Sequence, residues 1–158
     1  TLPAVLRSQK SGAKPDFRPL ARRRRLFCLG RGLGLAIAGE AALKFKETCL
    51  LAVEGTSTAE FRHGPLALAD TDTAALVFQL DDATRHGTEA LIDTLQHRGA
   101  TVVVLGAGGT NLTSSFRHSA TQAIATIAHF YGAIHALALS LGLDPDAPPH
   151  LAKATLTE

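Results

Sequence analysis

Short apolar runs alternate along the chain with longer segments in which apolar and polar residues recur at helical spacing. Short uncharged runs bounded by turn residues are typical of buried strands, and longer periodic segments are typical of amphipathic helices. The apolar runs predict strands at Leu26–Leu29, Leu51–Val53, Thr73–Leu80 and Thr101–Leu105. The last run, TVVVL, is the clearest of these, because β-branched residues fit a pleated and half-buried surface.

The longer segments predict three helices. One begins near Gly34 and continues toward Leu50, one spans His86–Arg98, and one spans Ser119–Leu143. Gly99 is expected to end the second, since glycine readily adopts the left-handed conformation that closes many helices. The inner face of this second helix is predicted to consist of Ala90, Leu91, Ile92 and Leu95.

The segment Ser119–Leu143 contains no Asp, Glu, Lys or Arg, and its length alone would suffice to cross a membrane. It is alanine-rich, carries Gln122, His129 and His135, and lacks aromatic belts. We therefore expect no membrane partner, but a helix packed against the sheet or at a subunit interface. His129 and His135 lie six positions apart, which does not form one helical face, so they predict no metal site.

Strands that alternate with helices predict an α/β fold, a three-layer αβα sandwich with a mostly parallel sheet of about five strands. We expect residues 25–149 to form this domain. Residues 1–24, interrupted by Pro15 and Pro19, are expected to form an arm or interdomain linker. Residues 150–158 are expected to form a tail that leaves the body of the domain.

Composition limits the class of protein. The chain has 158 residues, 46% hydrophobic and 19% charged, which is typical of one globular domain. The net charge of +2 says little about partners. The run Arg22–Arg25 could contact nucleic acid or phosphate, but it is interpreted as the solvated start of a strand, because no second basic cluster or aromatic platform accompanies it. No nucleic acid partner is therefore expected. Cys28 and Cys49 are expected to be reduced core residues of a cytoplasmic protein. Residues 1–14 lack the apolar region of a signal peptide, and the absence of Met favours a fragment.

The first candidate segment is the turn Gly30-Arg31-Gly32, which joins a strand to a helix. Glycines there allow backbone N–H groups at the helix N-terminus to face a phosphate. A tight turn without a ligand is an equally favoured reading. On the helix that follows, Glu40, Lys44 and Glu47 are spaced four and three apart and share one face. Taken alone, the last two would form a solvated ion pair.

The second candidate segment is Arg62–Pro65, with the sequence RHGP, in which glycine and proline stop regular structure around His63. Before it, a hydroxyl of Thr56, Ser57 or Thr58 is expected to cap a short turn through Phe61. An alternative role for His63 is a hydrogen bond that fixes the loop. The sequence contains no HxxxH, CxxC or clustered carboxylate pattern, so neither a metal nor another cofactor is expected.

These motifs together resemble a known family. They are Gly30-Arg31-Gly32, the helical segment ALKFKE at 42–47, the segment AEFRHGP at 59–65, Leu143-Asp144, and HLAK at 150–153. In this order they are similar to the sugar isomerase (SIS) domain family, in particular the C-terminal SIS domain of glucosamine-6-phosphate synthase and aminotransferase-related phosphosugar isomerases. The resemblance covers about residues 20–158 and implies a flavodoxin-like strand order.

The resemblance also implies roles for particular residues. Glu47 resembles the family's proton-shuttling base, and His63 its ring-opening acid or base, which reaches the site of a neighbouring subunit. Lys153 resembles the tail lysine that meets the open-chain carbonyl, and Lys44 a supporting lysine. The implied substrate-binding residues are Gly30, Arg31, Gly32 and Ala152.

The implied activity is aldose–ketose isomerisation of a hexose or hexosamine 6-phosphate in a homodimer. Most of the family's phosphate-binding Ser/Thr loops lie in a first SIS domain, so we expect such an N-terminal domain in the native protein and an incomplete activity here. No glutaminase domain is recognisable. The alternative is a non-catalytic SIS module that binds a phosphosugar for regulation or supports dimerisation.

Overall fold

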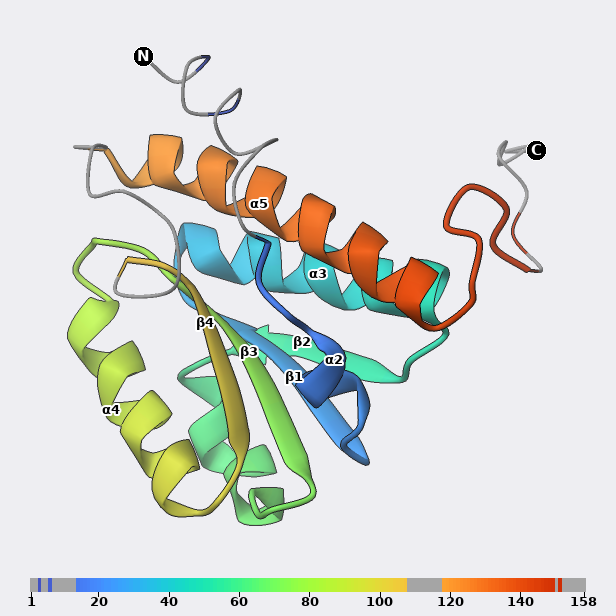
Figure 1. The fold of residues 1–158 in the computed structure, drawn as a ribbon. Coiled ribbons are helices and arrows are strands. Elements are labelled where there is room, and N and C mark those ends of the chain that lie inside the picture. Colours follow the sequence, from blue (N-terminus) through green and yellow to red (C-terminus); the bar gives the residue numbers. More distant parts are fainter. Residues whose placement is uncertain (1–2, 4–5, 7–13, 108–117, 150, 152–158) are drawn as a thin grey trace, which may run out of the picture.

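The computed structural model describes residues 14–107 and 118–149, together with positions 3, 6 and 151. A parallel sheet is covered by helices on both of its faces, which makes three layers (Figure 1). This confirms the predicted α/β sandwich. In the described residues the sheet has four strands, and the expectation of about five was wrong there.

The sheet has the order β2-β1-β3-β4, and every neighbouring pair is parallel. Its strands are β1 (Arg25–Gly30), β2 (Val53–Ser57), β3 (Thr73–Gln79) and β4 (Thr101–Gly106). From β1 the chain crosses to β2 on one side, and from β3 it crosses to β4 on the other. The carboxyl ends of β1 and β3 therefore form the switch point at which open α/β sheets bind ligands.

Strand β2 lies at an edge of the described sheet and differs from its prediction. We expected a strand at 51–53 that Glu54-Gly55 would end, but the strand begins at Val53 and continues to Ser57. A Cβ atom at Gly55 would lie 2.9 Å from the carbonyl oxygen of Ala38 in the covering helix. The glycine thus marks a close approach of helix and strand rather than the end of the strand.

Helices α3 (Leu33–Cys49) and α5 (Ser119–Ser140) cover one face of the sheet. Phe130 of α5 is fully buried, and its ring centroid lies 5.8–5.9 Å from those of Phe17, Phe45 and Phe78. Among the described residues α5 is long and apolar enough to cross a membrane by length and composition alone. Here it packs on α3 and the sheet, as predicted.

The N-terminal segment joins this layer. We expected residues 1–24 to form an arm or linker, but in the described part of this segment α2 (Arg18–Ala21) packs with the domain. Phe17 and Leu20 are buried in the same cluster as Phe45 and Phe130. Residues from 17 onward therefore contribute to the core.

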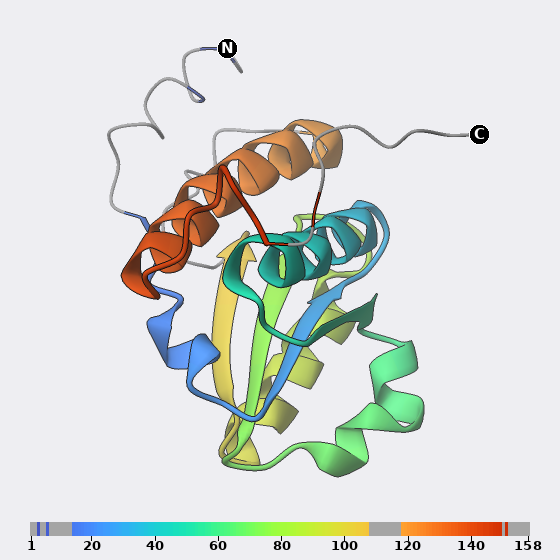
Figure 2. The same ribbon diagram turned by 90° about the vertical axis from the view of Figure 1, so that its right-hand side faces the viewer.

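The opposite face of the sheet is covered by α4 (Arg85–His97) and two short 3-10 helices, η1 (Glu60–His63) and η2 (Pro65–Leu68) (Figure 2). Residues 62–65 are thus largely helical, with Gly64 between the two turns, where we expected a loop. The hydroxyl of Ser57 accepts a hydrogen bond from the backbone N–H of Glu60 at 2.9 Å, which is the predicted contact. The N-cap residue of the turn is Ala59, not one of the three predicted hydroxyl residues.

Helix α4 ends as predicted, because Gly99 follows it with φ +82°. Leu91, Ile92 and Leu95 are buried. Ala90 is exposed and Thr88 is buried instead, so the inner face was wrong at Ala90. The Thr88 hydroxyl donates to the carbonyl oxygen of Thr84, which lets a polar residue occupy this inner position.

The buried histidine of α5 makes stability depend on pH. Among the described groups, His129 Nε2 is buried without a hydrogen-bond partner, and burial lowers the pKa of His129. Below about pH 6.5 the unfolded chain gains a proton there that the folded chain resists. Stability is therefore expected to fall as the pH drops from 7 toward 5, by at most about 1.4 kcal/mol per pH unit from this group.

Replacement of His129 by leucine should make this pH dependence shallower, as measured by urea unfolding at pH 7 and pH 5. His135→Leu is the matched control, because His135 lies on the same helix and is exposed. Equal pH dependence in the wild type and His129→Leu would contradict this assignment.

Candidate active site

A row of charged side chains lies along one face of α3. Lys44 Nζ lies 2.5 Å from Glu47 Oε2 and 3.7 Å from Glu40 Oε1. The three side chains are about one-third exposed. Residues three and four apart are neighbours on a helix surface, so the predicted shared face is confirmed. One ammonium group is thus placed between two carboxylates and lies closer to Glu47.

A residue from α5 completes this row. The hydroxyl of Tyr131 donates to Glu40 Oε1 at 2.9 Å. We call Glu40, Lys44, Glu47 and Tyr131 the α3–α5 cluster. Sequence analysis missed Tyr131, because no periodicity within a helix reveals which distant helix packs beside it. The sequence offered one indication of its importance: Tyr131 is the chain's single tyrosine and directly follows Phe130.

Electrostatics keep Lys44 and Tyr131 each in one protonation state near neutral pH. The hydrogen bond to Glu47 raises the pKa of Lys44; burial opposes this and the charge of Glu40 adds to it. Burial raises the pKa of Tyr131, and its hydrogen bond to Glu40 raises it further. Lys44 is therefore a cation and Tyr131 a neutral donor at pH 7. A carboxylate beside a fixed cation can accept a proton from a carbon whose neighbouring oxygen gains negative charge.

His63 lies on the other side of the sheet. It belongs to η1 and is exposed, while its neighbour Phe61 packs edge-on against Phe27 at 4.9 Å. Phe61 belongs to the core cluster under α4, whereas Phe45 of α3 belongs to the cluster under α5. The sheet thus separates His63 from Glu47 within one chain.

The glycine turn is built tightly. A Cβ atom at Gly30 would lie 2.1 Å from the carbonyl oxygen of Gly34, and Gly32 has φ +56°. The turn faces the segment after β3, where Asp82 Oδ2 lies 3.7 Å from the Cβ position of Gly32. Asp82 Oδ1 accepts hydrogen bonds from the backbone N–H and hydroxyl of Thr84. This carboxylate opposes the binding of a phosphate at the turn.

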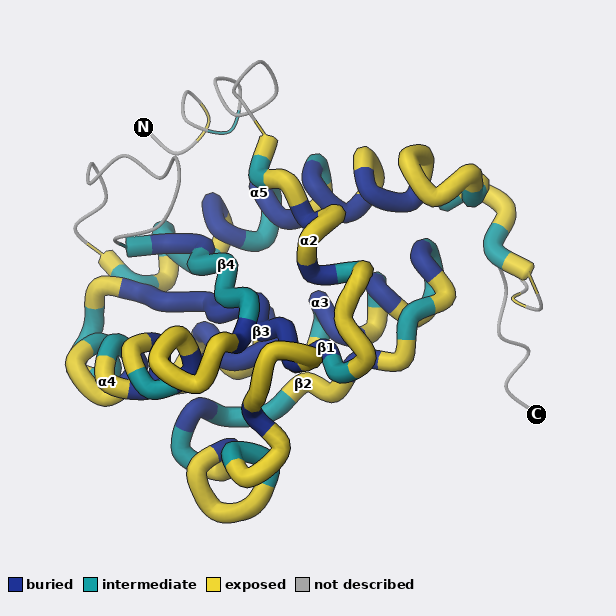
Figure 3. The backbone as a smooth tube through the Cα atoms, turned by 60° about the horizontal axis from the view of Figure 1, so that its bottom comes forward, coloured by how far each residue is buried: buried dark blue, intermediate teal, exposed yellow. Residues whose placement is uncertain are grey.

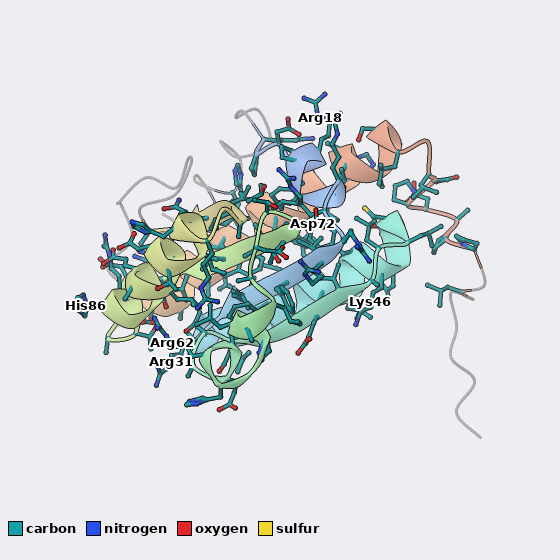
Figure 4. All side chains as sticks on the ribbon, turned by 90° about the horizontal axis from the view of Figure 1, so that it is seen from below. Arg18, Arg31, Lys46, Arg62, Asp72 and His86 are labelled. Carbon is teal, nitrogen blue, oxygen red and sulfur yellow. The ribbon has the colours of Figure 1, made fainter. Side chains whose placement is uncertain are left out.

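The turn is also distant from the α3–α5 cluster. Gly32 precedes the first residue of α3 and Glu47 lies near its end, so the helical rise separates them by about 20 Å. Figure 4 shows Arg31 and Lys46 well apart on opposite sides of the view. A hexose 6-phosphate is much shorter than this distance. The structure therefore does not bring Gly30, Arg31 and Gly32 together with Glu47 in one site.

Two further candidates, Ala152 and Lys153, lie outside the described residues. Within the described ranges no group of three or more His, Cys, Asp or Glu side chains is placed to hold a metal ion. Cys28 and Cys49 are free and buried, and burial raises the pKa of both thiols. Neither thiol is a suitable nucleophile at neutral pH.

An open cleft of about 750 Å³ lies at the start of β1 and β2. It is lined by Arg24, Arg25, Lys46 and Glu54, with Leu26, Phe27 and Val53 among its apolar residues. Of the candidate catalytic residues that the structure describes, Lys44, Glu47 and His63, none lines it. Strand β2 has one buried residue, Val53, and the η1–η2 segment at its other end is largely exposed, in contrast to the fully buried β3 (Figure 3).

Comparison with known proteins decides the family. The model of the SIS domain matches residues 19–141, which include the sheet and both layers of helices. The chain belongs to the SIS domain family. This confirms the resemblance of the motifs, and it makes the chain a relative of phosphosugar enzymes rather than only of their fold.

The relatives of this SIS domain are longer proteins. It is 30% identical over 157 residues to glutamine–fructose-6-phosphate aminotransferase (isomerizing) of Thermotoga maritima, covering 91% of this chain and 26% of the relative. A crystal structure of glucosamine-6-phosphate deaminase from T. maritima matches with a TM-score of 0.72 and 27% identity, over 98% of this chain and 45% of that one.

A crystal structure of tagatose-6-phosphate ketose/aldose isomerase from Escherichia coli matches with a TM-score of 0.65 and 27% identity. That match covers 87% of this chain and 41% of the other. The SIS domain thus spans about a quarter of the aminotransferase and less than half of either structure.

Proposed function

We propose that this SIS domain is the C-terminal half of an enzyme that isomerises a hexose or hexosamine 6-phosphate. The observation that carries the proposal is the Lys44–Glu47 pair on α3, at 2.5 Å, within a domain of the SIS family. Aldose–ketose isomerisation moves a proton between two adjacent carbons, which needs a carboxylate near them and a cation for the developing negative charge.

In the proposed reaction Glu47 takes the proton from one carbon of the open-chain sugar and returns it to the next. Lys44 keeps Glu47 in place and supplies positive charge. His63 of a second chain assists ring opening, since the sheet separates it from Glu47 in its own chain. Lys153 is proposed to meet the open-chain carbonyl, and Ala152 to line the same site.

We further propose that the phosphate group is held by another domain of the native protein. The support is the distance of about 20 Å between the glycine turn and Glu47 along α3, together with the carboxylate of Asp82 at that turn. We still propose that Gly30, Arg31 and Gly32 contact a ligand. That ligand would bind at the switch point of the sheet, separately from Glu47. The isolated chain should isomerise poorly, because remote phosphate binding supports catalysis at the reacting carbon.

The test is a coupled isomerase assay on the native-length protein with hexose and hexosamine 6-phosphates, with and without ammonia. Turnover of at least one substrate is expected. The absence of turnover with every substrate would contradict the proposal. We also propose that the protein is cytoplasmic. The support is that Cys28 and Cys49 are both buried free thiols.

Exposed apolar residues favour self-association of the chain, which is also the basis of the alternative function, a dimerisation or phosphosugar-binding module. Leu35 and Leu43 of α3 and Ile124 and Leu139 of α5 are 40–57% exposed. Contiguous exposed apolar surface marks interaction sites, and we propose that these residues of the outer helical layer contribute to one. We therefore expect a dimer at tens of micromolar in sedimentation experiments.

Replacement of Leu139 by glutamate should yield a monomer. Ala90→Glu is the control, because Ala90 is exposed on α4, a helix that carries no residue of the proposed site. A monomeric wild type would contradict the dimer. Equal loss of association in both variants would contradict the choice of this face.

A further inference from the structure

The same oxygen atom of Glu40 lies near two donors. Tyr131 OH donates to Glu40 Oε1 at 2.9 Å, and Lys44 Nζ lies 3.7 Å from this Oε1, which is beyond hydrogen-bond distance. Lys44 is instead bonded to Glu47. The phenol therefore occupies the carboxylate that would otherwise compete for the ammonium group.

We propose that Tyr131 is a positioning residue, which holds Glu40 away from Lys44 so that Lys44 remains paired with Glu47. The inference rests on the proposed function, in which Glu47 moves the proton. Tyr131 does not touch the reacting atoms in this scheme. It acts through Glu40 and Lys44, and it makes the pairing of the lysine depend on the packing of α5 against α3.

Helix geometry explains why such a residue is needed. A glutamate four residues before a lysine is the better orientation for an ion pair on a helix. Glu40 has this position relative to Lys44, whereas Glu47 follows Lys44 by three. Without another contact, Glu40 would be a strong competitor for the ammonium group. The hydrogen bond from Tyr131 occupies one acceptor site of Glu40 Oε1 and holds that oxygen 3.7 Å from the ammonium group, which weakens the competition with Glu47.

The core fixes the phenol in its place. Tyr131 follows Phe130, whose buried ring contacts Phe17, Phe45 and Phe78. The rings of Phe130 and Tyr131 lie 5.9 Å apart. Because interiors are closely packed, the buried ring sets the rotation of α5 and with it the direction of Tyr131. The donor therefore reaches Glu40 from a rigid element.

The contact can be tested without any activity. Tyr131 is the chain's single tyrosine and the chain has no tryptophan, so ultraviolet absorbance titrates this phenol alone. Glu40→Gln should lower the pKa of Tyr131 toward its usual range, since a nearby negative charge raises the pKa of a phenol. Glu54→Gln is the control, because Glu54 is exposed on β2. An unchanged titration in Glu40→Gln would overturn the contact.

The positioning role is tested by kinetics of the native-length protein. Tyr131→Phe is expected to lower kcat about tenfold, which corresponds to a shift of Lys44 from Glu47 to Glu40 in most molecules. KM and the thermal midpoint should change little. Adding Glu40→Gln to Tyr131→Phe should restore most of kcat, because the competing carboxylate charge is then absent. A merely structural contact would give no such rescue.

The outcomes separate this inference from the proposed function. Wild-type turnover with unchanged kcat in Tyr131→Phe would overturn the positioning role and leave the proposed function intact. Additive losses in the double variant would also overturn it. No turnover by the wild type would overturn the proposed function, and with it the role of Tyr131 in catalysis, whatever the optical titration shows about its contact with Glu40.

Discussion

Replacement of Glu47 by glutamine in the native-length protein is expected to lower kcat by about 10²- to 10⁴-fold, the usual contribution of a general acid or base. The amide retains the shape of the side chain and still accepts a hydrogen bond from Lys44, but it cannot take a proton from carbon. KM should change far less than kcat, because the lost interaction belongs to the transition state. Steady-state kinetics with the substrate that the wild type turns over measures both constants.

Stability provides the internal check on this variant. The Lys44–Glu47 pair is partly exposed, so its loss should cost well under about 1 kcal/mol of unfolding free energy. Glu54→Gln is a matched control on the exposed edge strand and should retain wild-type kcat. If Glu47→Gln keeps its kcat, Glu47 is only an ion-pair partner on the surface, and the proposed mechanism is wrong.

The sequence predicted the strands where local pattern and burial agree. Strands β3 and β4 are close to their predicted bounds, because short uncharged runs bounded by turn residues are typical of buried strands. Strand β2 was misplaced, because Gly55 was interpreted as the end of a strand. The glycine is instead needed where the strand passes close to α3, since a Cβ atom there would lie 2.9 Å from the helix backbone. The burial of Phe17 was missed for a similar cause: its partners, Phe45 and Phe130, are distant in sequence.

The candidate site was predictable to the same extent. Helical spacing alone placed Glu40, Lys44 and Glu47 on one face, since that relation is local. Three features depend on tertiary structure instead. They are the contribution of Tyr131 from another helix, the sheet between His63 and Glu47, and the length of α3 between the glycine turn and the catalytic pair. The order of motifs along the chain does not reveal how these residues are arranged in space.

Truncation of Phe130 to alanine is expected to cost about 3–5 kcal/mol of unfolding free energy, the usual range for a large buried aromatic side chain. Phe130 is fully buried and contacts three other buried rings, so neighbouring residues cannot fill the cavity without moving α2, α3 or β3. Since domains of this kind are stable by only about 5–15 kcal/mol, the loss is a large fraction of the total. Urea unfolding at pH 7 measures it.

Leu141→Ala is the control for this truncation, because Leu141 is 44% exposed at the end of α5 and should cost less than about 0.5 kcal/mol. A loss below about 1 kcal/mol in Phe130→Ala would contradict the role assigned to this ring. If the ring also fixes the direction of Tyr131, the folded Phe130→Ala variant should show a Tyr131 pKa closer to its usual range, as the bond to Glu40 loosens. The two measurements on one variant thus connect the packing of α5 to the pairing of Lys44 with Glu47.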